Sequence, residues 1–148
     1  MRVVVQRVKH SSCTVDNKLI SSIDKGFMLL IGFKETDTNI ELEKILKKVT
    51  GLRIFEDENG KMNKSLLDVN GSILAISQFT LYADCKHGNR PSFTEAMKFD
   101  KAIAYYDLFC EKLVSLGYDV KKGIFGADMK IELLNDGPVT IILDSEQL

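Results

Sequence analysis

Two short segments contain the residues that could carry chemistry in this chain of 148 residues. In the first, polar groups follow one another in Ser77-Gln78-Phe79-Thr80, directly after an apolar run that starts at Ile73. We expect a strand over residues 73–82, and strand ends commonly frame pockets because rigidly held side chains lie there beside free main-chain groups. Ordinary hydrogen bonds at a sheet edge are the alternative for these polar side chains.

The second segment is Asn135-Asp136-Gly137-Pro138-Val139-Thr140, which contains one of only two prolines. Proline cannot donate a hydrogen bond within a sheet, yet an apolar run resumes directly after Pro138. A tight turn explains the pattern, since Asn, Asp and Gly all tolerate turn geometry. An exposed recognition tip also explains it, because either isomer of a Gly–Pro bond fixes the direction of neighbouring carbonyl oxygens that could orient a small polar ligand.

Conventional catalytic groups are scarce. His10 and His87 are the two histidines, and neither has a Ser or Cys partner close in the sequence. No nucleophile elbow, glycine-rich phosphate loop or histidine cluster for a metal is present. Cys13 and Cys110 lie in apolar segments typical of core cysteines, whereas Cys85 lies in a polar segment. We therefore expect no metal and no cofactor, and a histidine triad only if its members meet in space.

The charge balance argues against a general attraction to nucleic acid. The 20 basic and 21 acidic side chains give a formal net charge of -1, so any RNA contact must use a local patch. The loop Lys86-His87-Gly88-Asn89-Arg90-Pro91 concentrates three potentially cationic side chains and is one candidate for contacts to phosphates. A solvated loop is the alternative. The same two interpretations apply to Lys44, Lys47 and Lys48 of the first expected helix and to Lys121 and Lys122 near the end of the second.

The totals predict one domain over residues 1–148, without a linker, repeat or low-complexity tract. Three cysteines without CxxC spacing argue against a disulfide framework or a structural zinc site, which favours a reducing cytosol. The apolar run 27–33 is too short to span a bilayer. We therefore expect a cytoplasmic protein that has no membrane partner.

Runs of β-branched and apolar residues predict most of the strands that position these segments. We expect a β-branched opening over 3–15, a turn at 16–18, a second strand over 19–23 and a strand buried on both faces over 27–33. Further strands are expected at 53–55 and 73–82 and on both sides of Gly137-Pro138. Many strands with few helices indicate an α/β fold of mixed, largely antiparallel sheets in layers.

Helical periodicity predicts two main helices that cover these sheets. The first begins at Thr36 or Asp37 and ends at Gly51. The second runs from about residue 100 to Gly117. The first helix is expected to bury one apolar stripe, formed by Ile40, Ile45, Leu46 and Val49.

Both chemical segments resemble the signature motifs of the D-aminoacyl-tRNA deacylase family. Ser77-Gln78-Phe79-Thr80-Leu81 and Asn135-Asp136-Gly137-Pro138-Val139-Thr140 match these motifs in order and without a gap. The opening segment 1–8, the loop 90–93 and the segment Phe125-Gly126-Ala127-Asp128-Met129 also look like family sequence, so the resemblance covers the whole chain. It implies a barrel-like fold of the D-aminoacyl-tRNA deacylase type over residues 1–148.

The resemblance implies a cytoplasmic homodimer that hydrolyses the ester between a D-amino acid and the terminal adenosine of tRNA. Such an enzyme is a carboxylic ester hydrolase, and glycine mischarged on tRNA(Ala) is also expected to be a substrate. Aminoacylated tRNA is the expected partner, with no role for DNA. Family members have their active site at the subunit interface.

The same resemblance assigns roles to the second segment. In the family the Gly–Pro bond is cis and enters the pocket of the partner subunit. The carbonyl oxygens of Gly137 and Pro138 would then meet the α-amino group of the substrate, and an L side chain would collide. Arg7 would brace these carbonyls. The mouth of the pocket, or the support of the Gly–Pro loop, is expected to come from Phe125, Gly126, Ala127 and Met129, although core packing also explains Phe125 and Met129.

For the chemical step we favour main-chain groups over a side-chain nucleophile. Thr80 has no evident base beside it. The N–H groups around Phe79 and Thr80, with Ser77 and Gln78 nearby, could polarise the ester and stabilise its oxyanion, while the 2′-hydroxyl of the RNA helps to activate water. A nucleophilic Thr80 stays open as an alternative.

Two rival functions also stay open. One is a related deacylase that removes L-alanine from the wrong tRNA, in which the Gly–Pro bond is trans and the pocket wider. The other is a non-catalytic dimer that binds RNA ends or nucleotides.

Overall fold

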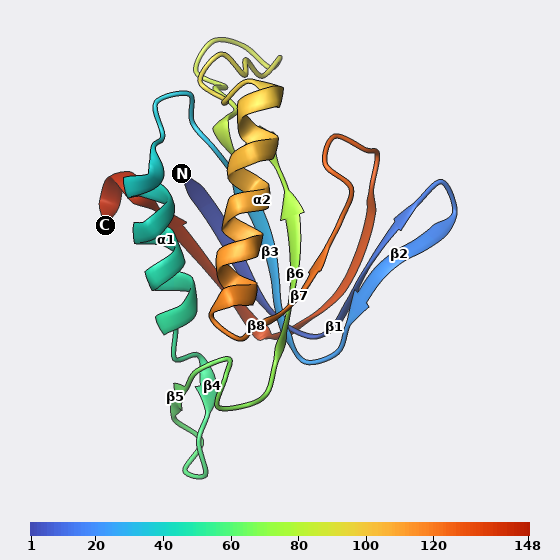
Figure 1. The fold of residues 1–148 in the computed structure, drawn as a ribbon, viewed down its shortest axis with the longest axis vertical. Coiled ribbons are helices and arrows are strands. Elements are labelled where there is room, and N and C mark those ends of the chain that lie inside the picture. The colour runs from blue at the N-terminus through green and yellow to red at the C-terminus, as the bar shows by residue number, and fades with distance from the viewer.

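A computed structural model describes residues 1–148, and it has the predicted mixed α/β architecture with two main helices (Figure 1). The elements in chain order are β1 (Arg2–Val15), β2 (Lys18–Ile23), β3 (Gly26–Gly32), α1 (Asn39–Gly51), β4 (Phe55–Glu56), β5 (Met62–Lys64), β6 (Ser72–Ser77), the 3-10 turn η1 (Phe79–Tyr82), α2 (Phe99–Ser115), β7 (Asp119–Lys122), β8 (Lys130–Asp144) and the 3-10 turn η2 (Ser145–Gln147).

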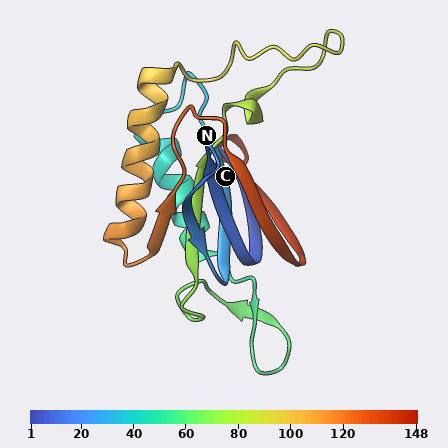
Figure 2. The same cartoon turned by 90° about the vertical axis from the view of Figure 1, so that its right-hand side faces the viewer.

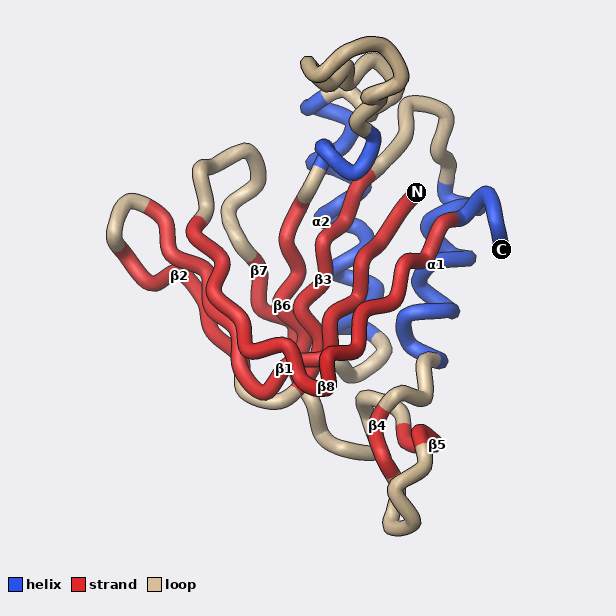
Figure 3. The backbone as a smooth tube through the Cα atoms, turned by 180° about the vertical axis from the view of Figure 1, so that it is seen from behind, coloured by secondary structure: helices blue, strands red, loops and turns tan.

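The long strand β1 organises a six-stranded sheet. The strand order is β2-β1-β3-β6-β7, and β8 also pairs with β1. β1 is antiparallel to β2, β3 and β8, whereas the pairs β3–β6 and β6–β7 are parallel. The two ends of this order approach each other (Figure 3), and the Ser21 hydroxyl of β2 donates to the Lys122 carbonyl of β7 at 2.8 Å. The sheet is therefore barrel-like, as predicted.

Both helices pack on the same side of the sheet (Figure 2), and the main core lies between the two layers. This core has 24 buried residues, including Phe27 of β3, Ile73 of β6 and Phe109 of α2. A smaller core of 7 buried residues, including Cys13 and Met28, fills the inside of the curled sheet. Full burial of one such large side chain stabilises the fold by roughly 1.5–3 kcal/mol. Neither helix is long and apolar enough to cross a membrane.

The first turn of α1 is closed by a capping box. The Thr38 hydroxyl accepts a hydrogen bond from the Ile40 N–H at 3.2 Å, and the Glu41 carboxylate accepts from the Thr38 N–H at 2.8 Å. The N-cap is therefore Thr38, and the prediction of Thr36 or Asp37 was wrong. The spacing Thr-x-x-Glu was the signal in the sequence that identifies this cap.

The buried stripe of α1 also differs from the prediction by one residue. Leu42 is buried together with Ile45, Leu46 and Val49, whereas Ile40 is 64% exposed. Ile40 lies in the first turn, two residues after the N-cap Thr38. The second helix, α2, ends at Ser115, and Gly117 follows it with a φ of +93°, which is typical of a glycine after a helix.

The expected long strand over residues 73–82 is shorter than predicted. β6 ends at Ser77, and the Gln78 N–H donates a last hydrogen bond to Ile31 of β3 at 2.7 Å. Because β3 itself ends at Gly32, β6 has no partner beyond this point. The chain then bends into η1, which opens with a bond from the Leu81 N–H to the Gln78 carbonyl.

Gly137 and Pro138 lie inside β8 and do not reverse the chain. β8 pairs with β1 before these residues, up to Val8↔Asn135, and again after them from Gln6↔Thr140. Residues 136–139 thus face the single residue Arg7 of β1 and form a bulge, here called the Gly–Pro bulge. Strand structure on both sides is confirmed, but the segment is not a tight turn between two strands.

Candidate functional site

A cavity of about 520 Å³ lies at the end of β6. Its walls come from β3, β6, η1, the region around the start of α2 and the connection before β8. A cavity of this size with mainly apolar walls and a few polar groups is typical of small-ligand sites. The predicted site residues that line it are Ser77, Gln78, Phe79, Phe125, Gly126, Ala127 and Met129.

The turn η1 supplies main-chain donors beside this cavity. The first N–H groups of a 3-10 turn have no partner within the turn. The Leu81 N–H bonds to Gln78, but those of Phe79 and Thr80 donate to no other atom of the chain. They are therefore free to receive a hydrogen bond acceptor from a ligand.

Thr80 does not line the cavity, and its side chain is exposed. Its hydroxyl accepts a hydrogen bond from the Gln78 side-chain amide at 2.6 Å. An amide cannot act as a base towards this hydroxyl. The Thr80 hydroxyl is therefore held in place by Gln78, but no base lies beside it to activate it.

Arg2, which sequence reasoning did not single out, holds the far end of η1. Its guanidinium donates to the Leu81 carbonyl at 2.7 Å, stacks over the Tyr82 ring at 4.8 Å and pairs with Asp144 at 2.8 Å. Burial alone would raise the pKa of Asp144, but hydrogen bonds from the Glu146 N–H and from Arg2 lower it. Asp144 therefore stays ionised and holds Arg2 against the turn.

Aromatic rings form the walls on both sides of the cavity. Phe79 packs edge-on against Phe93, and Phe99 packs edge-on against Phe125, each with ring centroids 5.0 Å apart. Such pairs add about 0.5–1.5 kcal/mol beyond simple burial. Gly126 has a φ of +79°, and a Cβ on it would lie 2.7 Å from the Phe99 ring. Only glycine fits this position without displacing Phe99. Phe99 itself was not predicted as a site residue.

The Gly–Pro bulge rests on Arg7, which is only 4% exposed. Arg7 donates to the Asp136 carbonyl at 3.1 Å, to the Ile54 carbonyl at 2.7 Å and to the Glu56 carboxylate at 3.0 Å. The hydrogen bond from Arg7 lowers the pKa of Glu56. Arg7 thus braces the bulge through the residue that precedes Gly137, and the Gly137–Pro138 peptide bond is cis.

The two groups of predicted site residues do not meet within one chain. Arg7, Gly137 and Pro138 are not part of the cavity wall, and Gly137 and Pro138 are exposed. A Cβ on Gly137 would lie 2.9 Å from the Val139 side chain and 3.1 Å from the Arg7 guanidinium, at a φ of +124°. The bulge is therefore tightly packed underneath and open to solvent on its outer side.

The remaining nucleophilic and basic side chains lie elsewhere. His10 and His87 are exposed, and neither lines the cavity. Cys13 and Cys110 are buried and Cys85 is exposed, as predicted. Burial raises the pKa of Cys110 to about 12, which makes it a poor nucleophile. No group of three or more His, Cys, Asp or Glu side chains is arranged to hold a metal ion.

Fold and site together define a class of protein: a mixed α/β domain with an aromatic-walled cavity and free main-chain donors at the end of a central strand. The family described as D-Tyr-tRNA(Tyr) deacylase matches residues 4–144, and the chain belongs to this family. A D-aminoacyl-tRNA deacylase of Phocaeicola vulgatus is 55% identical over 99% of this chain and 98% of its own. One of Limosilactobacillus reuteri is 54% identical over 97% and 99%.

Two solved structures share the fold of this chain. One named "c-Myc DNA Unwinding Element Binding Protein" is 44% identical, with a TM-score of 0.92 over 97% of this chain and 98% of that one. A probable eukaryotic D-amino acid tRNA deacylase has a TM-score of 0.82 over 96% and 97%, and at 21% identity it shares the fold. The family and the enzyme class predicted from the two motifs are confirmed.

Proposed function

We propose that the protein hydrolyses the ester of D-aminoacyl-tRNA and releases free D-amino acid and tRNA. The observation that carries this proposal is the convergence of Ser77, Gln78, Phe79 and the segment 125–129 on one cavity beside free N–H groups. The bacterial relatives are named D-aminoacyl-tRNA deacylases, which supports the substrate class. Aminoacyl-tRNA is made in the cytoplasm, so we assign the protein to that compartment and expect no role for DNA.

In the proposed chemical step, main-chain groups polarise the ester. The N–H groups of Phe79 and Thr80 stabilise the negative charge that develops on the carbonyl oxygen when water attacks. The 2′-hydroxyl of the terminal adenosine helps to activate that water. The acyl–oxygen bond then breaks, and its electron pair and a proton from water go to the ribose oxygen. No side-chain nucleophile is required, in agreement with the isolation of the Thr80 hydroxyl from any base.

Handedness is proposed to be read by the Gly–Pro bulge of a second copy of the chain. Gly137 and Pro138 are exposed and do not line the cavity of their own chain, so the bulge is free to enter the cavity of a partner in a homodimer. The carbonyl oxygens of Gly137 and Pro138 would accept the α-amino group of the substrate, and an L side chain would clash. Glycine lacks a side chain, so glycyl-tRNA mischarged on tRNA(Ala) is expected to be hydrolysed too.

A deacylation assay on four substrates tests the proposal: D-tyrosyl-, L-tyrosyl-, glycyl- and L-alanyl-tRNA. We expect fast loss of D-tyrosine and glycine, with L-tyrosine retained as in a control without enzyme. Rapid loss of L-alanine with D-tyrosine untouched would instead support the related L-alanine deacylase.

Nucleic-acid binding without catalysis is the second candidate, favoured by the name of the 44% identical structure, a DNA unwinding element binding protein. It would be supported by tight binding of charged tRNA with no acceleration of hydrolysis. A duplex DNA of similar length, added as competitor, measures whether DNA binds at all; we expect it to leave hydrolysis unchanged.

A further inference from the structure

Residues 84–93 form an arm that projects from the molecule (Figures 1 and 2). Its base is closed by two backbone hydrogen bonds between Asp84 and Ser92, at 2.8 and 2.9 Å. Every residue from 85 to 93 is exposed. The arm therefore has a defined root but buries little surface of its own, so packing does not explain its length.

The arm carries positive charge that the rest of the chain does not neutralise. Lys86 and Arg90 are in no ion pair, and no acidic residue occurs between 85 and 94. By contrast, Lys112 of α2 and Lys122 of β7 pair with carboxylates at 2.7 and 2.6 Å. The whole chain has a net charge of -1, so the arm is a local region of positive charge on it.

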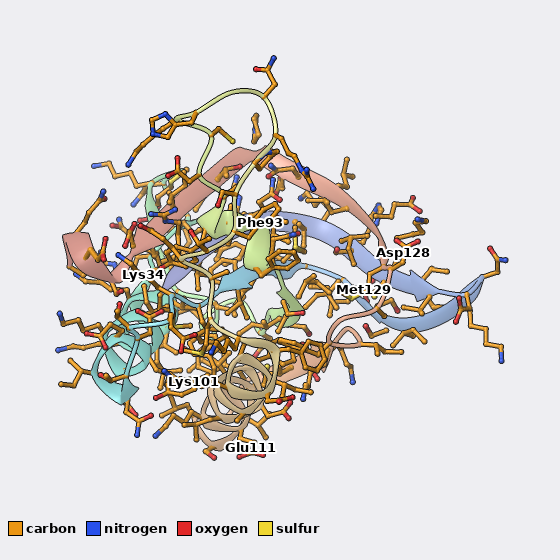
Figure 4. All side chains as sticks on the ribbon, turned by 90° about the horizontal axis from the view of Figure 1, so that it is seen from above. Lys34, Phe93, Lys101, Glu111, Asp128 and Met129 are labelled. Atoms are coloured by element: carbon orange, nitrogen blue, oxygen red, sulfur yellow. The ribbon has the colours of Figure 1, made fainter.

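The root of the arm is part of the cavity region. The chain enters the arm from η1 and leaves it towards Met97 and Phe99, and both flanking segments line the cavity. Phe93 at the root packs edge-on against Phe79, with ring centroids 5.0 Å apart. Seen from above, the arm extends beyond Phe93 on the side opposite α2 (Figure 4). A molecule whose end enters the cavity would therefore pass beside the arm.

We propose that this arm binds the phosphate backbone of the acceptor end of tRNA, through Lys86 and Arg90. The inference rests on the proposed function, which brings the 3′ end of a tRNA into the cavity. From the root at Asp84 to the tip at Gly88, four residues at roughly 3.3 Å each give the arm a reach of about 13 Å. This reach is long enough to lie along several nucleotides of one RNA strand. Lysine and arginine contacts to phosphates position the nucleic acid without reading its bases, so the arm serves tRNAs of different sequence.

The lysines of α1 provide a matched control surface. Lys44 and Lys47 are exposed and in no ion pair, as on the arm, but no residue of α1 lines the cavity. The double variant Lys44→Gln/Lys47→Gln therefore removes the same charge as Lys86→Gln/Arg90→Gln at a place that the proposed substrate does not reach.

The experiment compares both double variants with the unchanged protein on two substrates, D-tyrosyl-tRNA and the minimal substrate D-tyrosyl-adenosine. For the arm variant we expect KM for the tRNA substrate to rise about five- to tenfold with kcat nearly unchanged. We also expect the slope of log(kcat/KM) against log[salt] to become shallower by about one to two. The minimal substrate should be hydrolysed equally by all three proteins. Binding of an uncharged tRNA transcript, followed by fluorescence anisotropy, should weaken by a similar factor for the arm variant alone.

Two results would overturn the arm's role. One is an equal effect of the arm and α1 variants on tRNA binding. The other is a loss on D-tyrosyl-adenosine as large as on tRNA, which would mean that the arm acts on the cavity through Phe93 and not on the RNA. Failure of the proposed function is a separate result: the unchanged protein would hydrolyse neither substrate, and the anisotropy measurement would still decide whether the arm binds tRNA.

Discussion

The cavity and the Gly–Pro bulge are built in opposite ways. The cavity lies between layers, walled by Phe79, Phe99 and Phe125, and its polar groups are free main-chain donors at a strand end. The bulge lies on the outer surface of β8 and is held from below by the buried Arg7. One region is ready to receive a ligand, whereas the other is packed against its own chain underneath and open to solvent on its outer side.

Under the proposed function, this difference means that each chain carries two halves of different sites. A flexible loop would explain exposure of Gly137 and Pro138, but the contacts beneath them do not fit flexibility: Arg7 makes hydrogen bonds to Asp136, Ile54 and Glu56. Burying the charge of Arg7 beneath a small exposed bulge costs folding free energy, unless other contacts offset the desolvation. We attribute the arrangement to recognition, and the following variants separate the two regions.

The largest effect is expected for Gly137→Ala. The new methyl group would lie 2.9 Å from Val139 and 3.1 Å from Arg7, at a φ of +124° that L residues rarely adopt, so the bulge must shift. Misplacement by about 1 Å can cost about a hundredfold in rate, and we expect that loss in kcat/KM for D-tyrosyl-tRNA. Gly60→Ala is the matched control, because Gly60 also has a positive φ but has open space around it. Unchanged activity and chiral preference in Gly137→Ala would remove the bulge from the site.

Arg2→Gln should have the next largest effect, on the cavity side. It removes the hydrogen bond to the Leu81 carbonyl and the pairing with Asp144, so η1 loses its anchor. We expect kcat to fall about tenfold, with KM within about twofold, since a displaced oxyanion donor acts in the transition state. The control is Arg53→Gln, an exposed arginine that bonds to Asn63 in the β4–β5 hairpin. Equal kcat values for the two variants would contradict a positioning role for Arg2.

Thr80→Ala should have a smaller effect. The hydroxyl accepts one hydrogen bond from Gln78 and has no base beside it, while the Thr80 N–H is retained in the variant. We expect kcat to decrease by less than about tenfold, because main-chain donors carry the chemistry in the proposed mechanism. Complete loss of hydrolysis, with folding and tRNA binding intact, would support a nucleophilic hydroxyl instead.

The smallest effect concerns the pH dependence of the support beneath the bulge. Because Arg7 lowers the pKa of Glu56 in the folded protein, the stability from this pair is present above the ordinary glutamate pKa of about 4.3 and is lost as the pH falls through the lowered value. Urea unfolding of the unchanged protein and of Glu56→Gln should differ at pH 7, and the difference should shrink as the pH falls through the lowered pKa of Glu56. A difference that persists at low pH would show that Glu56 acts through packing and not through its charge.

Much of the fold could be predicted because local patterns and tertiary environment agree. Phe27 to Gly32 is apolar throughout and is a strand buried on both faces. On α1, the stripe of Ile45, Leu46 and Val49 faces the main core, as its spacing indicates. The cavity residues Ser77 to Phe79 were found because polar groups follow directly after a buried strand.

The rest depends on partners that are distant in the chain. The end of β6 is decided by the length of its neighbour β3, so the apolar alternation that continues to Tyr82 predicted too long a strand. The bulge at Gly137 exists because β8 pairs with β1 on both sides of it, which no local signal records. Phe99 and Arg2 join the site through tertiary contacts alone.

The central claim is that the cavity of one chain and the bulge of a second form one site, and mixed dimers test it directly. We would co-express Gly137→Ala, which has a defective bulge, with Ala127→Phe, which fills the cavity, and isolate the mixed dimer through two different tags. If the halves act between chains, one of the two sites combines an intact cavity with an intact bulge, so about half of the normal rate on D-tyrosyl-tRNA should return. A mixed dimer no more active than its two parent variants would contradict the claim.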